Sequence, residues 1–385
     1  MTYRKSRGDC WLRSVAFLIA FALVQTGAEA QSASGTITTA AGWDEGCSAL
    51  AADPAGSLYV LNNHGVQKLN SKTGRFTTVS PSRVSGAAIG VDAAGNIYLA
   101  QSRYGPLGFT VQKLAAGGGA MITFAGTKEK YMGSGRRMPG PASQAFLLNP
   151  DVLALDTTGN LYIGEQDSYN QPNDVFKMTN STGVITQVPL SVFPTKRGDP
   201  VDPIARSVRT VQPGALAFDS DGNLYIADYS TNVVWEVAPE GGLLKRVAGS
   251  GRGSGEGYGG DGGPAVNAKL EGPAGLAFDA AGNLYISDEG NNRIRMVAKG
   301  SRVITTVAGN GTSRKLTVDV SGPDGNLHPQ YQKVDDGDGG PATQARITTP
   351  HSISFDGSGN LYICASGILR KVSGIGSATQ PSPTH

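Results

Sequence analysis

The sequence predicts an all-β protein, a six-bladed β-propeller of four-stranded antiparallel blades, and three observations support this fold class. A short phrase recurs six times along the 385 residues, each copy has the chemistry of a β-hairpin, and further β-prone segments follow each copy at a regular interval. Self-similarity of this kind is typical of propellers and solenoids. Glycine, at 54 residues, is about twice as frequent as usual, which suits a fold with many turns.

The recurring phrase is an apolar run, an aspartate, two further residues, glycine, asparagine or serine, leucine or isoleucine, and tyrosine. Two apolar runs flank a polar turn whose glycine can take positive φ easily, so each copy predicts a hairpin. The six repeat aspartates are Asp53, Asp92, Asp156, Asp219, Asp279 and Asp356.

A third strand is predicted after each tyrosine strand, and a fourth strand in most units. The third strands are expected at residues 66–69, 111–114, 175–178, 233–237, 294–297 and 368–372. Four antiparallel strands per unit predict a propeller blade. The repeat cores are expected near residues 47–80, 86–126, 150–189, 213–249, 273–309 and 351–373, the last completed by residues 35–42.

The sixth unit has no fourth strand of its own. Residues 36–42 repeat the isoleucine, threonine, alanine and glycine pattern of residues 303–309, which is a fourth strand. We therefore expect the N-terminal strand to complete the last blade and close the ring, which leaves no exposed sheet edge at the junction.

These repeats resemble a known family. The segment 279–288, with the sequence DAAGNLYISD, and the following NNRI at residues 291–294 resemble the consensus of the NHL repeat, and the copy at Asp219 is nearly as similar. The resemblance covers nearly all of the chain after residue 30 and implies a secreted bacterial NHL-repeat β-propeller. It is specific for the fold but not for the function, because NHL propellers serve enzymes, sensors and binding modules alike.

The N-terminus has the features of a secretory signal peptide. An apolar run at residues 14–24 is too short to span a bilayer comfortably, and Ala28-Glu29-Ala30 is an A-x-A cleavage site. The basic residues before the apolar run are Arg4, Lys5, Arg7 and Arg13. We expect residues 1–30 to be removed and the product, without a membrane span, to be secreted or periplasmic; an uncleaved anchor is the alternative. Residues 374–385 are expected to form a disordered tail.

The net charge limits the classes of partner that this protein is expected to bind. The net charge is +2, so neither nucleic acid nor an anionic membrane is an expected partner, and we expect a monomer.

Two cysteines, Cys47 and Cys364, remain after signal cleavage. Ring closure makes their blades neighbours, so a disulfide is a candidate, and two buried free thiols are the alternative.

One face of the predicted propeller carries the long connections, at residues 126–149, 189–212, 250–272 and 310–349. Long, varied loops on a rigid scaffold commonly carry function. On this loop face, polar and aromatic residues of the second-to-third strand connections could recognise a protein, a glycan or a small ligand; the alternative is that they are ordinary surface residues. They are Arg103, Tyr104, Asp167, Tyr169, Tyr229 and Glu289.

The axial mouth of the same face is the other candidate site. The position five residues before each repeat aspartate holds Ser48, Ala87, Asp151, Gly214, Ala274 and His351. Only Asp151 and His351 could ligate, whereas a catalytic metal usually needs three protein ligands. The sequence also contains no nucleophile elbow, zincin motif or phosphate loop. We therefore favour a non-enzymatic binding scaffold that acts through the loop face; a metal-assisted lyase or hydrolase at the axial mouth is the alternative.

Three of the long connections share the phrase GPAxxA, at residues 140–145, 263–268 and 340–345, which predicts a short helical turn that begins at proline. Acidic, glycine-rich loops precede two of these phrases and contain Asp261, Asp335, Asp336 and Asp338. Carboxylates in such loops can bind Ca²⁺, but the EF-hand pattern fails because its twelfth position lacks glutamate. We expect no cofactor and ordinary turn chemistry here, with Ca²⁺ as the alternative.

Overall fold

The computed structural model describes most of the chain after residue 34: residues 35–40, 46–70, 73–80, 86–101, 109–127, 139–165, 174–191, 211–252, 257–313, 316–319, 328–331 and 336–376. Every described residue belongs to one compact unit, Ser32–His385. The predicted signal peptide, residues 1–30, lies outside the described residues. No helix within the described ranges is long and apolar enough to cross a membrane.

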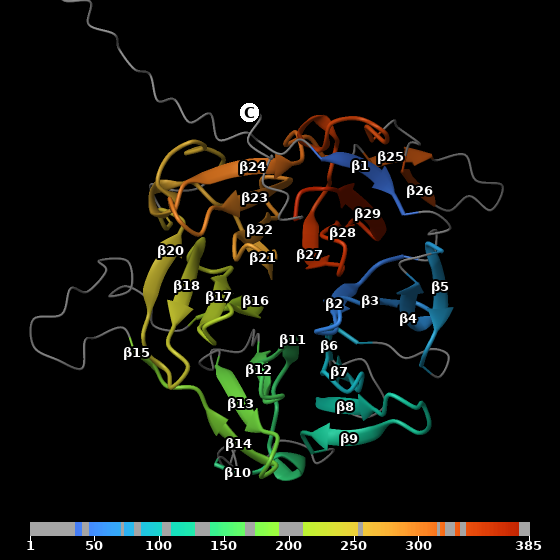
Figure 1. The fold of residues 1–385 in the computed structure, drawn as a ribbon, viewed down its shortest axis with the longest axis vertical. Coiled ribbons are helices and arrows are strands. Elements are labelled where there is room, and N and C mark those ends of the chain that lie inside the picture. Colours follow the sequence, from blue (N-terminus) through green and yellow to red (C-terminus); the bar gives the residue numbers. More distant parts are fainter. Residues whose placement is uncertain are drawn as a thin grey trace, which may run out of the picture. The chain divides into compact units, whose positions relative to one another are not determined.

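Six antiparallel sheets, each with four main strands, follow one another around a common axis, which confirms the predicted six-bladed propeller (Figure 1). Blades 1 to 3 contain β2 (Ala49–Ala52), β3 (Leu58–Asn62), β4 (Gly65–Asn70) and β5 (Arg75–Thr78); β6 (Ala88–Val91), β7 (Ile97–Gln101), β8 (Thr110–Leu114) and β9 (Ile122–Ala125); and β11 (Pro150–Leu155), β12 (Leu161–Glu165), β13 (Val175–Thr179) and β14 (Val184–Gln187), with β10 (Gly140–Pro141) added to β14.

Blades 4 to 6 contain β16 (Pro213–Phe218), β17 (Leu224–Asp228), β18 (Val233–Val237) and β20 (Lys245–Ala248); β21 (Pro273–Phe278), β22 (Leu284–Asp288), β23 (Arg293–Val297) and β24 (Ile304–Ala308); and β27 (Pro350–Phe355), β28 (Leu361–Ala365), β29 (Ile368–Ser373) and β1 (Thr36–Thr39). Two small pairs lie outside the blades: β15 (Leu190–Ser191) with β19 (Gly242–Leu243), and β25 (Leu316–Asp319) with β26 (His328–Tyr331).

The repeated aspartate organises the hairpin turn of every blade. One of its carboxylate oxygens accepts a hydrogen bond of 2.8–2.9 Å from the backbone N–H four residues later. The glycine of each turn has φ between +76° and +82°, a conformation that favours glycine. In blades 2 and 5 the tyrosine hydroxyl also donates to this carboxylate, at 3.0 and 3.2 Å. The repeat therefore encodes the hairpin turns of the face opposite the long loops.

Apolar clusters between neighbouring blades form the core. The repeat tyrosine contributes to this packing: Tyr162 contacts Phe218 of the next blade edge to face, with ring centroids 4.7 Å apart. The pairs Tyr225–Phe278 and Tyr285–Phe355 repeat this geometry at 4.9 and 4.8 Å. Each such pair contributes about 0.5–1.5 kcal/mol beyond the burial of its surface.

The N-terminal strand closes the ring, as predicted. β1 pairs antiparallel with β29 over four residues, from Thr36 opposite Ser373 to Thr39 opposite Arg370 (Figure 1). The side chain of Ile37 is fully buried between blades 5 and 6. The packed chain extends beyond the predicted boundary at residue 373, because Ile375 is only 8% exposed and its carbonyl accepts a hydrogen bond from Tyr285.

A disulfide joins Cys47, just before blade 1, to Cys364 in blade 6. The two Cα atoms lie 5.5 Å apart across a sequence separation of 317 residues. Both side chains belong to the apolar cluster between blades 1 and 6, so packing brings the two thiols together. The bridge encloses five whole blades in one covalent loop, at the junction that β1 closes by hydrogen bonding.

Deletion of residues 31–42 should open the ring. We expect a lower melting temperature and self-association, because the deletion exposes the edge of β29 and removes buried Ile37. Calorimetry and light scattering after gel filtration measure both effects. Thr36→Ala is the matched control, since Thr36 is exposed and the strand remains in place. A truncated protein that stays monomeric with unchanged melting would contradict the closure model.

Loss of the disulfide should destabilise the folded propeller. For the double variant Cys47→Ser/Cys364→Ser we expect the free energy of unfolding to fall by about 2–5 kcal/mol, because the bridge restricts a very long loop of the unfolded chain. Denaturant unfolding measures the loss, and the reduced wild type should match the variant. An unchanged unfolding midpoint in both would show that the bridge does not support closure.

Candidate functional site

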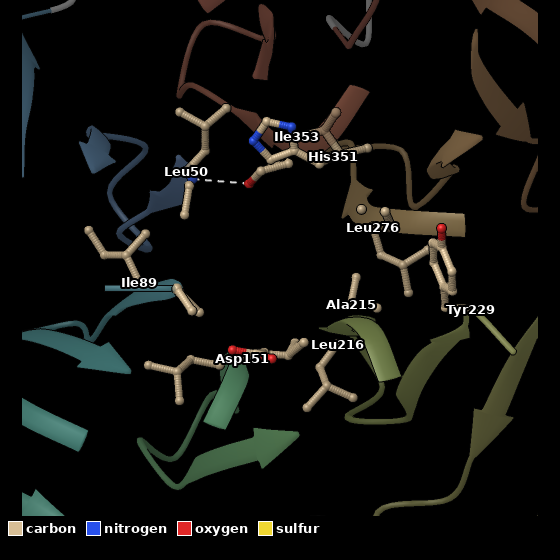
Figure 2. Close-up of a pocket in the computed structure, with 18 of the residues that line it drawn as sticks. Leu50, Ile89, Asp151, Ala215, Leu216, Tyr229, Leu276, His351 and Ile353 are labelled. Carbon is tan, nitrogen blue, oxygen red and sulfur yellow. Dashed lines mark hydrogen bonds between the residues drawn. The ribbon is translucent and has the colours of Figure 1, made fainter. Parts of the chain in front are cut away.

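A cavity of about 510 Å³ opens at the axis on the loop face, and all six blades contribute to its lining (Figure 2). We call it the axial cup. Its lining includes every residue at the position five before a repeat aspartate: Ser48, Ala87, Asp151, Gly214, Ala274 and His351. Figure 2 shows Asp151 and His351 on opposite sides of the cavity. The structure thus brings together the two residues that the sequence singled out for the axial ring.

A β-bulge exposes the cup residue in blades 3 to 6. Each inner strand begins with a buried proline, and the register shifts between that proline and the second residue after it. In blade 3, Pro150 lies opposite Glu165 and Val152 opposite Gly164, so Asp151 has no partner in the ladder. His351 occupies the same place in blade 6. Bulges of this kind redirect a side chain away from the sheet and are frequent beside functional sites.

The floor of the cup is a ring of aliphatic side chains, one from each inner strand, three residues before the repeat aspartate. The ring consists of Leu50, Ile89, Leu153, Leu216, Leu276 and Ile353. The same six residues also line a second cavity, of about 400 Å³, on the face of the hairpin turns. The aliphatic ring therefore lies between two polar mouths and gives the cup an apolar base.

The convergence of the inner strands explains why small residues surround the cup. A Cβ atom on Gly214 would lie 2.6 Å from the carbonyl oxygen of Pro273, in the next blade. A Cβ atom on Gly275 would lie 2.8 Å from the carbonyl oxygen of His351. Neighbouring inner strands are so close that larger residues would force them apart.

Asp151 is the most perturbed acid in the cup. Burial raises the pKa of its carboxyl from 3.8 to about 6, although the amide of Asn149 donates a hydrogen bond to Oδ2 and opposes the rise. At neutral pH the side chain therefore carries a charge that its surroundings solvate poorly. A residue held in a state that costs stability is more typical of a functional site than of a scaffold.

Glu289 and His351 supply the other ionisable groups of the cup lining. Burial raises the pKa of Glu289, and the positive charge of protonated His351 partly opposes this rise. His351 Nδ1 lies 3.3 Å from the carbonyl oxygen of Thr349, whose own N–H donates to Asn292 Oδ1 at 2.8 Å. The backbone before His351 is thus anchored to blade 5.

Tyr229 forms an aromatic edge of the cup. Its side chain is 43% exposed, and its ring packs so closely on Gly272 that a Cβ there would lie 2.9 Å from the ring. Its N–H donates to the carbonyl of Gln212, which also lines the cup. Asp228 in turn accepts a hydrogen bond from the N–H of Gln212. The ring is therefore held in place while much of its surface stays accessible.

The remaining recognition residues predicted from the sequence cannot be placed in the cup. Arg103, Tyr104, Asp167 and Tyr169 lie outside the described residues, so their part in recognition stays a prediction. The sequence singled out Tyr229 and Glu289 as loop residues, and the structure locates both at the cup. Sequence reasoning missed Gln212 and the aliphatic floor. The constant offset of the floor residues from the repeat aspartates was the signal that could have revealed them.

The acidic loops proposed for Ca²⁺ use their carboxylates between blades. Asp261 accepts hydrogen bonds from Arg295 and from the N–H of Thr306, at 2.5 and 3.0 Å. Asp338 repeats this contact in blade 6, with Arg370 at 2.6 Å and the N–H of Thr39 at 2.9 Å. Burial alone would raise the pKa of Asp261, but Arg295 and the hydrogen bonds hold the pKa below its ordinary value.

The other two acidic candidates add little to this picture. Asp336 lies 3.9 Å from Arg346, and Asp335 lies outside the described residues. Within the described ranges, no three histidine, cysteine or acidic side chains are grouped so that they could hold a metal ion. Ca²⁺ binding by these loops, the alternative to ordinary turn chemistry, remains untested.

The GPAxxA phrases form 3₁₀ turns, η1 (Ala142–Gln144), η3 (Ala265–Asn267) and η4 (Ala342–Gln344), each preceded by its proline. Each turn bridges two blades. Ala265, for example, accepts a hydrogen bond from Gly249 of blade 4 and donates one to Arg302 of blade 5. The GPAxxA segments, which we call straps, therefore connect neighbouring blades through backbone hydrogen bonds. Together with the acidic loops they stabilise the contact between blades.

Comparison with known proteins supports the repeat assignment. The NHL repeat family model matches residues 270–295, which span β21, β22 and part of β23. The chain contains an NHL repeat and folds as a six-bladed β-propeller. It is 31% identical to human NHL repeat-containing protein 2 over 112 residues, which make up 28% of this chain and 15% of that relative. This NHL propeller thus matches only a small part of the relative's length.

Solved structures share the fold of this NHL propeller. An auxiliary nutrient binding protein from Bacteroides ovatus superposes with a TM-score of 0.56 at 15% identity, over 88% of this chain and 76% of that chain. A gluconolactonase from Xanthomonas campestris superposes with a TM-score of 0.52 at 14% identity, over 88% and 89%. At such low identities the similarity shows the fold alone. The function must be argued from the site.

Asp151→Asn should stabilise the NHL propeller above pH 6, by about 1–2 kcal/mol after allowance for solvent screening. The folded protein binds the carboxyl proton of Asp151 more tightly than the unfolded chain does, because its pKa is higher in the folded protein. The stability that this proton contributes to the wild type is complete below pH 3.8 and is lost as the pH rises through about 6. The gain of the variant should therefore vanish on acidification from 6 to 3.8. Denaturant unfolding at several pH values measures it, with Asp221→Asn, on an exposed turn, as control. A gain independent of pH would contradict the assignment.

Proposed function

We propose that this NHL propeller is a non-enzymatic binding protein that holds a small ligand in the axial cup. The observation that carries the proposal is the shape of the cup. At the position five residues before the repeat aspartate, four blades contribute only serine, alanine or glycine, and the cavity of about 510 Å³ lies above the aliphatic ring. Cavities of about 300–1,000 Å³ with an apolar lining and a few polar groups are typical of small-molecule sites.

The polar groups of the cup suit recognition better than catalysis. Besides the phenol of Tyr229, the ionisable side chains of the described lining are two carboxylates and one imidazole, on three different blades: Asp151, Glu289 and His351. Ser352, next to His351, accepts a hydrogen bond of 3.0 Å from the N–H of Leu50, which ties blade 6 to blade 1 (Figure 2). That hydroxyl therefore has a structural role, and the arrangement resembles a recognition site more than a nucleophile with its base.

Filling the cup should abolish binding. A fragment library with neutral, cationic and anionic members, screened by ligand-observed NMR, should yield hits with the wild type. These hits should disappear with Ala274→Phe and with Ala87→Phe, because each ring would occupy the cup while circular dichroism reports the fold. Glu240→Gln, in an exposed turn, is the control and should keep every hit. Hits that persist in both filled variants would place binding elsewhere and overturn the proposal.

A lyase or hydrolase at the same mouth is the second candidate. The observation that favours it is the raised pKa of Asp151, about 6, in a cavity that also contains an imidazole, since groups that titrate near neutrality can act as general acid and base. Turnover of a panel of lactones, lost in both Asp151→Asn and His351→Gln, would support this candidate. Lactone turnover that survives both substitutions would not come from the cup.

We also propose that the protein is secreted or periplasmic. The Cys47–Cys364 disulfide supports this location, because such bridges persist in oxidising compartments. The basic and apolar N-terminal segment with its A-x-A site supports it independently. The intact mass of the protein from an exported fraction should correspond to a chain that begins at Gln31. A full-length chain found only with reduced thiols would count against export.

A further inference from the structure

The described lining of the cup contains more acidic than basic side chains, and this excess of negative charge indicates the kind of ligand that the cup would bind. The described lining contains two carboxylates, Asp151 and Glu289, and one imidazole, but no lysine or arginine. Within the described lining, an anionic ligand would meet carboxylates that are already poorly solvated, with only the imidazole of His351 to offset them. A cationic ligand would instead relieve the cost of burying those carboxylates.

The acidic side of the cup also carries its aromatic ring. Asp151 belongs to blade 3, Tyr229 follows the second strand of blade 4, and Glu289 follows the second strand of blade 5. The three side chains thus come from consecutive blades and form an arc along one side of the cup. On the other side, the described lining of blades 1 and 2 above the aliphatic ring consists of small residues, among them Ser48 and Ala87. A cation beside this arc would be close to carboxylates and to the exposed tyrosine face, which attracts positive charge.

The floor defines the rest of the ligand. Below the arc lies the ring of six aliphatic side chains, which includes Leu153 and Leu216 of the same two blades, 3 and 4, as Asp151 and Tyr229. A bare metal ion would gain nothing from such a floor, and the described residues present no three-ligand metal group. A ligand with an apolar body gains from burying that body against the floor.

We propose that the axial cup binds a small organic cation, an ammonium or guanidinium group on an apolar body. The cationic group lies between Asp151 and Glu289 against Tyr229, and the apolar body rests on the aliphatic floor. This inference rests on the proposed function and adds the chemical class of the ligand.

Three probes of similar size and different charge test the inference: phenethylamine, 2-phenylethanol and phenylacetate, each titrated by ligand-observed NMR. The amine should bind at least about tenfold more tightly than the alcohol, and phenylacetate should show no saturable binding. Asp151→Asn and Glu289→Gln should each weaken the amine by about three- to tenfold and leave the alcohol unchanged. Glu240→Gln, which removes an exposed carboxylate from a turn, should change neither.

The outcomes separate this inference from the proposed function. Suppose that the alcohol or phenylacetate binds as tightly as the amine, and that Ala274→Phe abolishes the binding of that probe and of the amine. The cup is then a binding site, but not one that selects cations. The cation assignment is wrong if the amine shows no saturable binding at millimolar concentration. It is also wrong if Asp151→Asn and Glu289→Gln each bind the amine as tightly as the wild type does. If the amine still binds to Ala274→Phe and Ala87→Phe, it binds outside the cup and both proposals fail.

Discussion

β1 pairs with β29 at the one junction where the two ends of the propeller meet, and the rest of the structure depends on this pairing. Each blade buries its sides only against its neighbours, so an open ring would expose apolar surface on both blades 6 and 1. The Cys47–Cys364 disulfide reinforces the same junction covalently. Closure also brings Ser48 and His351 to one cavity, because these cup residues lie at opposite ends of the sequence.

Convergence at the axis is the second constraint, and it connects the scaffold to the site. Six inner strands meet around the axis, so Gly214 and Gly275 are required where a neighbouring backbone is too close for a Cβ atom. In blades 3 to 6, bulges at the starts of the inner strands turn one residue per blade toward the cup, and Ser48 and Ala87 precede the inner strands of blades 1 and 2. The scaffold therefore presents a ring of six positions, of which most are small and two, Asp151 and His351, carry ionisable groups.

The carboxylates on the two faces of the propeller have different surroundings. On the face of the hairpin turns, the carboxylates of the repeat aspartates accept hydrogen bonds from the backbone of their own turns. On the loop face the straps and their acidic loops also support the ring, since Asp261 and Asp338 hold Arg295 and Arg370 of the next blades. Asp151 contrasts with these carboxylates, because burial raises its pKa and no cation in the described cup compensates it. That contrast is the reason to place recognition at the axis.

The repeat, the number of blades and the strand that closes the ring can be predicted from the sequence, because local turn chemistry and apolar alternation recur six times along the chain. A constant offset from the repeat aspartate also singles out Asp151 and His351. Three further features become visible only in the folded propeller: Cys47 pairs with Cys364, Asp261 and Asp338 bind arginines, and Glu289 and Tyr229 line the same cup as Asp151. These contacts join residues of different blades, and the distance between side chains from different blades depends on how the blades pack, which no local pattern encodes.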